Sequence, residues 1–537
     1  MPAESLMSRK VAHEGQRRRT FAIISHPDAG KTTLTEKILL YAGAIHLAGS
    51  VKGRRAARHA VSDWMQMEQE RGISVTSSVL QFDYRERALN LLDTPGHADF
   101  SEDTYRVLSA VDSSIMLIDH AKGVEARTRK LFEVCRLRGL PIVTFMNKLD
   151  REGQNPLALI DEVGQTLDLR VAPINWPIGM GRSFRGVIDV DTRAVTLFLA
   201  EAHGSKEAIS RRTTLEQAVS AGDVSAELGR QVEEDLALLE AAGERFSPTA
   251  FRQGTLSPCF FGSAQSNFGI EALLDFLAEQ ALPPGPRALV PTGEVPPADE
   301  SFSGFVFKIQ ANMNPRHRDR IAFLRVVSGA FRRNMEVVLG RTGGRLKLSK
   351  PHSFFAQERA IVDEAWPGDI IGLYDPGDLR IGDTLAEHRA LSFAGIPRFA
   401  PEFFARLELA DPLKRKALDQ GLRQLGHEGV IQLFTAEGAG GHQGTILGAV
   451  GMLQFEVLVE RLKNEYRVQS RLVPLSFRLA RWVGGGEPAV AWLRERRDYP
   501  LVYDRNGQPV VLAESPWSLQ YAEKHAPGLA LYEIEPL

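Results

Sequence analysis

Short runs of apolar residues alternate with amphipathic segments between residue 19 and about residue 150. Four of these runs have the length of a β-strand, and most are followed by a polar turn and a pattern with helical spacing. They span residues 21–24, 88–92, 114–118 and 142–146, and a fifth run follows at 259–261. Short buried strands that alternate with helices predict a mostly parallel sheet with crossover helices.

The stretch before the fifth run has a different character. Within residues 200–245 there are ten acidic and five basic residues, and Leu228, Val232 and Leu236 recur at helical spacing. This pattern predicts a solvated helical insertion over about residues 183–255.

Two further regions follow a proline-rich stretch at 283–286, which ends a helix and marks a domain boundary near 285–300. Residues 303–388 contain short alternating segments with frequent glycine turns, which predict a β-barrel. Beyond residue 393, two helical patterns flanked by strand-like runs predict an α+β domain. The expected organisation is an N-terminal arm at 1–18, a first domain at 19–289, a barrel at 290–390 and an α+β domain at 391–537.

Composition narrows the classes of protein that fit this pattern. The chain has 537 residues, 43% of them hydrophobic and 25% charged, which excludes a disordered, collagen-like or coiled-coil protein. Its net charge of −2 argues against a surface coated with positive charge. Because the chain has only two cysteines, we expect no disulfide framework. Because it has no long apolar stretch, we expect no transmembrane helix. We expect a cytoplasmic protein whose basic N-terminal arm is exposed and poorly ordered.

The first chemical motif follows the strand at 21–24 and precedes a helical pattern. Its residues are Ser25, His26, Pro27, Asp28, Ala29, Gly30, Lys31 and Thr32. It matches the phosphate-binding loop pattern G-x-x-x-x-G-K-[ST], except that Ser25 replaces the first glycine. Backbone N–H groups at the helix N-terminus would hold phosphate, Lys31 would reach the β- and γ-phosphates, and Thr32 would ligate Mg²⁺.

A second motif stands at the end of the strand at 88–92. It consists of Asp93, Thr94, Pro95, Gly96 and His97. Asp93 is a candidate for the magnesium shell, Gly96 for a contact with the γ-phosphate, and His97 for orienting the attacking water.

A base-recognition motif follows the strand at 142–146. It consists of Asn147, Lys148, Leu149 and Asp150, and a short segment after the fifth strand adds Ser263 and Ala264. A carboxylate at Asp150 accepts hydrogen bonds from guanine N1 and the 2-amino group, a donor pair that adenine lacks. The motifs together predict a guanine-nucleotide site and disfavour an ATPase.

The polar stretch between the first two motifs contains a candidate for a third magnesium ligand. GTPase switch segments place a hydroxyl on Mg²⁺ when the γ-phosphate is present. Ser74, within Arg71-Gly-Ile-Ser74, is the candidate, with Thr76 as the second choice. The proposed metal set is therefore Thr32, Ser74 and Asp93.

These motifs resemble those of the translational GTPases of the elongation factor type, and most closely the bacterial peptide chain release factor 3 family. The finer similarity covers about residues 15–480 and rests on 25–31, 62–65, 100–105, 312–323, 399–402 and 448–455. The fold that this resemblance implies is an α/β P-loop GTPase domain followed by a β-barrel domain and an α+β C-terminal domain.

The resemblance also implies a function. Such a protein would be a monomeric, ribosome-activated GTPase of translation termination that uses GTP and Mg²⁺. It would promote dissociation of the class I release factors, which read stop codons, after peptide release, with His97 as the catalytic residue. Two alternatives stay open: an elongation or translocation GTPase, and a GTP-dependent binding protein without turnover.

A basic stretch suggests where ribosomal RNA would bind. Residues 308–333 contain seven basic residues and one acidic residue. We expect this face of the barrel to contact RNA phosphates through Arg316, Arg318 and Arg320. The net charge of +6 in this stretch would offset the net charge of −5 in residues 200–245. A basic and an acidic surface would then cancel in the net charge of the whole chain.

Overall fold

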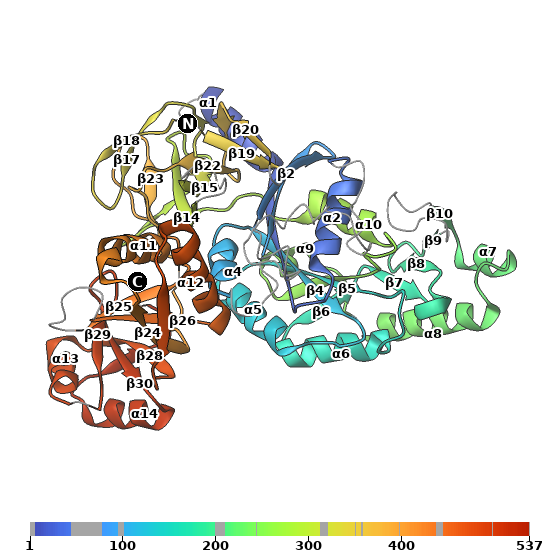
Figure 1. Ribbon diagram of the computed structural model, residues 1–537. Coiled ribbons are helices and arrows are strands. Elements are labelled where there is room, and N and C mark those ends of the chain that lie inside the picture. The colour runs from blue at the N-terminus through green and yellow to red at the C-terminus, as the bar shows by residue number, and fades with distance from the viewer. Residues whose placement is uncertain are drawn as a thin grey trace.

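The computed structural model arranges the chain as three domains, which follow one another from blue to red in Figure 1. It describes residues 6–44, 78–94, 101–198, 210–242, 244–311, 320–349, 351–355, 358–396, 398–436, 444–496 and 498–535. The first domain is built on a mostly parallel sheet with strand order β2-β3-β1-β4-β5-β11-β6. Its strands are β1 (Arg18–Ser25), β2 (Ser78–Tyr84), β3 (Arg87–Asp93), β4 (Ser113–Asp119), β5 (Ile142–Asn147), β6 (Arg170–Pro173) and β11 (Leu256–Phe261).

All five apolar runs predicted from the sequence are parallel strands of this sheet, whereas β2 is an antiparallel neighbour of β3. Helices cover both faces, as Figure 1 shows. One face carries α2 (Lys31–Tyr41) and α10 (Ile270–Gln280), and the other carries α4 (Ser101–Leu108), α5 (Ala126–Leu137) and α6 (Pro156–Leu167).

Strand β1 explains why both faces are apolar. Phe21 and Ile23 point into the core with α2 and α10, while Ala22 and Ile24 point into the core with α4, α5 and α6. Since successive side chains of a strand alternate between faces, a sheet covered on both sides needs a continuous apolar run.

The insertion is only partly helical, so its prediction as a helical segment is wrong in part. Its strands β8 (Gly186–Asp189), β9 (Val195–Phe198) and β10 (Ser210–Thr213) form an antiparallel sheet with β7 (Asn175–Ile178), which precedes the insertion. Helices α7 (Leu215–Ser220), α8 (Ala226–Ala242) and α9 (Pro248–Arg252) follow. Val232 and Leu236 on α8 are buried as the helical spacing predicted, and Trp176 Nε1 donates to Asp235 at 3.1 Å.

The second domain is the predicted barrel. Its main strands are β14 (Ser303–Ala311), β15 (Arg320–Ser328), β17 (Glu336–Leu339), β18 (Arg345–Lys347), β19 (Pro351–Phe355), β22 (Ile370–Tyr374) and β23 (Thr384–Ala386). They pair in the order β18-β17-β23-β14-β15-β22-β19, and β20 (Glu358–Ile361) pairs with β19. Phe355 of β19 also pairs with Leu80 of β2, so the sheets of the first and second domains are joined.

The third domain has the predicted α+β character. Its eight-stranded sheet has β24 (Phe403–Leu409), β25 (Gln432–Ala436), β26 (Thr445–Ala449), β27 (Ser470–Pro474), β28 (Leu479–Gly484), β29 (Leu501–Tyr503), β30 (Pro509–Ala513) and β31 (Ala530–Tyr532). Its helices are α11 (Arg415–His427), α12 (Met452–Tyr466), α13 (Gly486–Arg494) and α14 (Pro516–His525). Leu418, Leu422 and Leu425 are buried on one face of α11, as predicted.

Both cysteines are free and buried, which agrees with the expected absence of a disulfide. Burial raises the pKa of the Cys135 thiol to about 12. Among the described residues, no helix combines the length and the apolar composition needed to span a bilayer.

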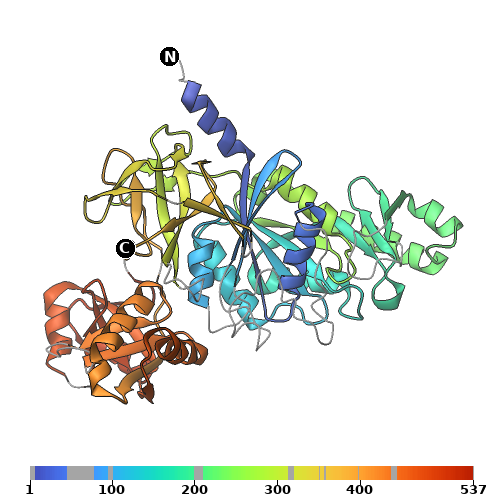
Figure 2. The ribbon, with the colours of Figure 1, turned by 45° about the horizontal axis from the view of Figure 1, so that its top comes forward.

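Residues 6–17 of the N-terminal arm form helix α1 (Leu6–Arg17), which corrects the prediction of an exposed and poorly ordered segment. Figure 2 shows α1 rising from the start of β1 beside the second domain. Val11 is fully buried with Ala330 and Trp366 of that domain, and the Lys10 ammonium lies 4.6 Å from the centre of the Trp366 ring. A single apolar anchor within a basic segment gave too weak a pattern to predict this contact.

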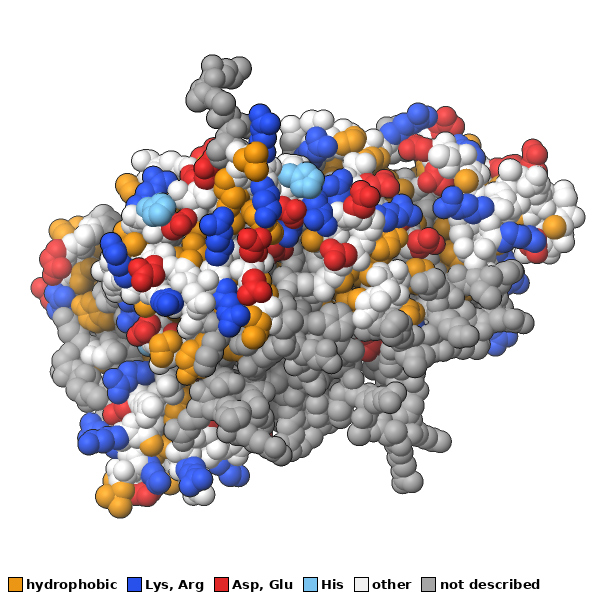
Figure 3. All heavy atoms as spheres, turned by 90° about the horizontal axis from the view of Figure 1, so that it is seen from above, with side chains coloured by type: hydrophobic (Ala, Val, Ile, Leu, Met, Phe, Trp, Pro, Cys, Tyr) orange, Lys and Arg blue, Asp and Glu red, His pale blue; other side chains and the backbone are white. Residues whose placement is uncertain are grey.

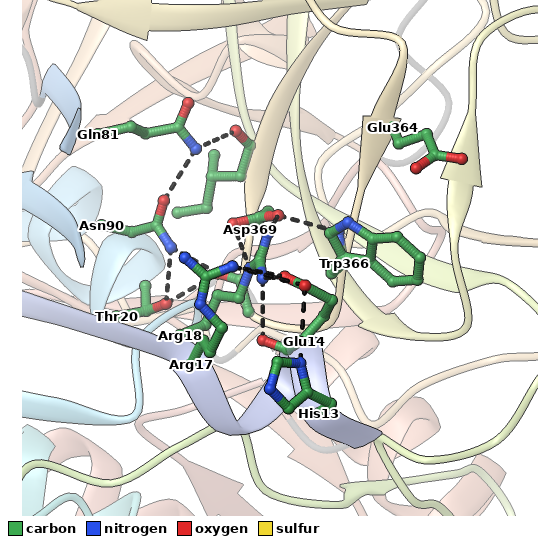
Figure 4. Close-up of polar contacts among 12 residues, drawn as sticks. His13, Glu14, Arg17, Arg18, Thr20, Gln81, Asn90, Glu364, Trp366 and Asp369 are labelled. Carbon is green, nitrogen blue, oxygen red and sulfur yellow. Dashed lines mark hydrogen bonds and ion pairs between the residues drawn. The ribbon is translucent and has the colours of Figure 1, made fainter. Parts of the chain in front are cut away.

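A polar network fastens α1 and β1 to the second domain (Figure 4). The Arg18 guanidinium forms an ion pair with Glu14 on α1. It forms a second with Asp369, in which Nη2 lies 3.2 Å from Oδ2. The Gly368 carbonyl accepts hydrogen bonds from Thr20 and Asn90 of the first domain. Gly368 has a φ of 103°, and a Cβ there would collide with Arg18, so the domains approach closely because this residue is glycine.

We expect Asp369→Ala to lower the free energy of unfolding by about 2 kcal/mol. The substitution leaves Arg18 with only one carboxylate partner and removes the acceptor of the Trp366 backbone N–H. Urea denaturation would measure the loss. Asp363→Ala is the matched control, because Asp363 is 79% exposed and its ion pair with Arg333 is long, at 3.5 Å. Equal effects of the two substitutions would contradict a structural role of Asp369.

Candidate functional site

The predicted motifs converge at one edge of the first domain. The phosphate-loop motif follows β1, Asp93 ends β3, Asn147 ends β5, and Ser263 follows β11. These strands are parallel, so their carboxyl ends lie at the same edge of the sheet, where open α/β sheets bind ligands.

The phosphate-loop motif forms a tight turn into a helix. The Ala29 N–H donates to the His26 carbonyl at 3.3 Å, Gly30 has a φ of 101°, and α2 begins at Lys31. A Cβ on Gly30 would collide with the Asn147 side chain, so glycine is required both by conformation and by space. Ser25 is buried at the end of β1, and Thr32 is half-buried in the first turn of α2.

Lys31 and Asp93 meet at the centre of this edge. The Lys31 ammonium lies 2.6 Å from Asp93 Oδ1, and both side chains are buried. The Thr35 hydroxyl approaches the same oxygen at 3.4 Å, and the Thr94 hydroxyl donates to the Ile23 carbonyl at 2.6 Å. The end of β3 is thereby held against the phosphate-loop motif.

Asn147 connects three loops through its side chain. Its Nδ2 donates to the Ala29 carbonyl at 2.8 Å, and its Oδ1 accepts from the Ala264 N–H at 2.8 Å. Because the side chain is buried and uses both a donor and an acceptor, no apolar residue could replace it without leaving polar groups unpaired. The same geometry also joins the phosphate-loop motif to the base-recognition motif.

Asp150 lies beside Ser263, so the two segments expected to form the guanine pocket are adjacent. The Ser263 hydroxyl donates to Asp150 Oδ1 and accepts from the Ser266 N–H at 3.2 Å. Leu149, which precedes Asp150, is fully buried, and its N–H donates to the Gly262 carbonyl at 3.2 Å. These contacts orient a carboxylate that is only half-buried and therefore able to meet a ligand.

Asp119, at the end of β4, was missed by the sequence reading. Its Oδ2 lies 2.7 Å from the Lys148 ammonium, which also donates to the Asp28 carbonyl at 2.5 Å. Burial acts to raise the Asp119 pKa, but the Lys148 hydrogen bond and charge outweigh it, so that the pKa is lowered. Its position at the carboxyl end of a predicted parallel strand was the signal that could have identified it.

Several predicted site residues lie outside the described residues, namely Ser74, Thr76, Pro95, Gly96, His97, Arg316 and Arg318. Within the described part of the chain, no cluster of three or more metal-binding His, Cys, Asp or Glu side chains occurs. A magnesium ion held by phosphate oxygens, a hydroxyl and one carboxylate needs no such cluster.

The prediction of a basic face over residues 308–333 is wrong for three of its seven basic residues. Arg320 is buried and pairs with Asp375 at 2.8 Å, Lys308 with Asp103 and Arg325 with Asp112. Each partner is distant in sequence or in another domain, so the charge count overstated the exposed positive charge. On the face shown in Figure 3, basic and acidic side chains are intermixed rather than segregated.

Comparison with known proteins gives three family matches along the chain. Residues 16–283 match the elongation factor Tu GTP binding domain, residues 301–388 match elongation factor G domain 2, and residues 393–523 match the C-terminal domain of class II release factor RF3.

Relatives that match nearly the whole chain include proteins named peptide chain release factor 3. The chain is 52% identical to peptide chain release factor 3 of Symbiobacterium thermophilum over 97% of its own length and 98% of the relative. It is 50% identical to the protein of the same name from Acaryochloris marina, over 100% of its own length and 98% of the relative. A crystal structure of a protein from Thermus thermophilus shares the fold, with a TM-score of 0.66 at 23% identity, covering 87% of this chain and 69% of that one.

Proposed function

Because this chain belongs to the peptide chain release factor 3 family, we propose that it hydrolyses GTP on the ribosome to promote dissociation of class I release factors after peptide release. The observation that carries the nucleotide part is the Asn147 side chain, which joins the phosphate-loop motif to the base-recognition motif. The C-terminal match to the release factor family favours termination over the alternative of translocation. A monomer in the cytoplasm fits this role.

The residues present fit a magnesium ion. Thr32, at the start of α2, would hold it directly, and Asp93 would hold it through water, with Ser74 as the hydroxyl ligand expected from the sequence. Bound there, the metal would neutralise charge on the phosphates. Lys31 adds a fixed ammonium beside Asp93, and the backbone around Gly30 lets phosphate approach closely.

Helix α4 could transmit a change at the nucleotide to the second and third domains, because it contacts both. It begins shortly after the Asp93–His97 motif in sequence. Asp103 on α4 pairs with Lys308 of the second domain at 3.3 Å, and Arg106 donates to the Gly429 carbonyl of the third domain at 3.3 Å. A change at the γ-phosphate that moves α4 would therefore move contacts in both domains.

The decisive experiment measures GTP hydrolysis without ribosomes, with vacant ribosomes, and with post-release complexes carrying a labelled class I release factor. We expect slow hydrolysis alone, faster hydrolysis with ribosomes, and accelerated loss of the labelled factor in the presence of GTP. Acceleration of tRNA translocation instead would support the alternative function.

We expect His97→Ala to keep GTP affinity and to slow ribosome-activated hydrolysis about a hundredfold. The reason is that His97, following Asp93-Thr-Pro-Gly96, is our candidate for positioning the attacking water. Single-turnover hydrolysis with ribosomes would measure the effect, with His388→Ala as the control at an exposed position of the second domain. An unchanged rate would remove His97 from the mechanism, and unaltered factor dissociation without hydrolysis would favour a binding switch without turnover.

A further inference from the structure

A cavity of about 390 Å³ lies where the first domain, the proline linker and the second domain meet. Three arginines line it: Arg138 directly after α5, Arg287 directly after the proline-rich stretch at 283–286, and Arg325 on β15. We call it the arginine cavity. Its one acidic lining residue is Asp112, which pairs with Arg325 at 2.5 Å, so the cavity has an excess of two positive charges.

The two remaining guanidinium groups share one acceptor. Arg287 Nη1 donates to the Ser109 carbonyl at 2.7 Å, and Arg138 Nη2 donates to the same carbonyl at 3.3 Å. Arg287 Nη2 and Arg138 Nε are buried and have no hydrogen-bond partner within the described part of the chain. Buried cationic donors without acceptors cost free energy, so the site is suited to a ligand that supplies several acceptor oxygens.

The surrounding residues hold these groups in place. The Arg287 guanidinium lies 3.9 Å from the centre of the Phe305 ring, and Arg325 also donates to the Gly368 carbonyl at 2.6 Å. Burial is the largest cause that lowers the Arg287 pKa to about 9, and the like charges of Arg138 and Arg325 add to it. A bound anion would relieve this repulsion.

We propose that the arginine cavity binds a small anion carrying a diphosphate group, at a site separate from the GTP site. Guanidinium groups match phosphate oxygens with paired N–H donors, and the cavity volume falls in the range of small-ligand sites. Its three arginines come from the two domains and the linker between them. An anion bound there would therefore add a further link between the first and second domains, which already share a sheet.

The test is calorimetric titration of protein saturated with GDP, at constant free Mg²⁺ and ionic strength, so that the GTP site is already filled. The probes are pyrophosphate and ADP, which represent a free and a nucleoside-linked diphosphate, with chloride as the background anion. We expect one saturable site per chain for pyrophosphate. Binding of ADP as well would identify a nucleoside-linked ligand, whereas binding of pyrophosphate alone would identify the inorganic ion.

Three variants assign the site. Arg287→Gln and Arg138→Gln should each weaken pyrophosphate binding at least tenfold, while Arg136→Gln should leave it unchanged. Arg136 lies in the last turn of α5, two residues before Arg138, which follows that helix directly, but the Arg136 side chain is 63% exposed. GDP affinity reports folding in each variant, and Arg138→Gln decides the outcome if Arg287→Gln does not fold. Absence of saturable binding, or full affinity in the glutamine variants, would overturn the proposal.

Discussion

Asp150→Asn should reverse the base preference of the nucleotide site, lowering affinity for GDP relative to xanthosine diphosphate by roughly 10⁴-fold. The carboxylate accepts two hydrogen bonds from guanine N1 and the 2-amino group. An amide would face that amino group with one of its own N–H donors, whereas the xanthine 2-carbonyl would accept from it. Because Ser263 holds the side chain at this position, the replacement amide should keep the same orientation.

Competition of unlabelled GDP and of xanthosine diphosphate against labelled GDP would measure this change. Asp161→Asn is the matched control, since Asp161 is an exposed residue of α6, away from the motifs. An unaltered preference for GDP in Asp150→Asn would place the base elsewhere, and the assignment of the base-recognition motif would then fail.

Lys31→Ala should reduce ribosome-activated GTP hydrolysis by about a thousandfold and should also weaken GTP binding. The ammonium is buried next to Asp93 at 2.6 Å, so its removal deletes the positive charge expected at the β- and γ-phosphates. It also leaves Asp93 with only the distant Thr35 hydroxyl, at 3.4 Å, as a partner from α2. Both effects act at the same point of the sheet edge.

Steady-state hydrolysis with saturating ribosomes would measure the loss of rate, and labelled-nucleotide titration the loss of affinity. Lys347→Ala, at an exposed position of β18, controls for the loss of one positive charge from the chain. Hydrolysis within tenfold of the unmodified protein would contradict the role of Lys31.

The parallel sheet and the nucleotide motifs could be predicted because their signals are local. A strand buried on both faces is a continuous apolar run, and the motif residues follow directly at the strand ends, as Lys31 and Asn147 do. The arrangement of these motifs around Asn147 agrees with that prediction. The positions of Ser74 and His97 remain predictions from the sequence.

Features that depend on distant partners could not be predicted. Arg320 and Arg325 belong to a basic stretch, but Asp375 and Asp112 neutralise them from other parts of the chain. Helix α1 is stabilised by Trp366, which lies far along the chain in the second domain. The strands of the insertion are short, and their apolar positions are too few to outweigh the helical pattern of α8.

The junction of β2 with β19 bears on how the protein can be dissected. If the chain were cut at the proline-rich stretch, β2 would lose its pairing with Phe355 of β19, and its backbone groups on that edge could pair with another molecule. Asp112 would lose Arg325, and the amide of Gln81 would lose the Ile370 carbonyl, which it reaches at 3.0 Å. An isolated nucleotide-binding fragment is therefore expected to self-associate, and the first two domains are better regarded as one folding module than as two interchangeable parts.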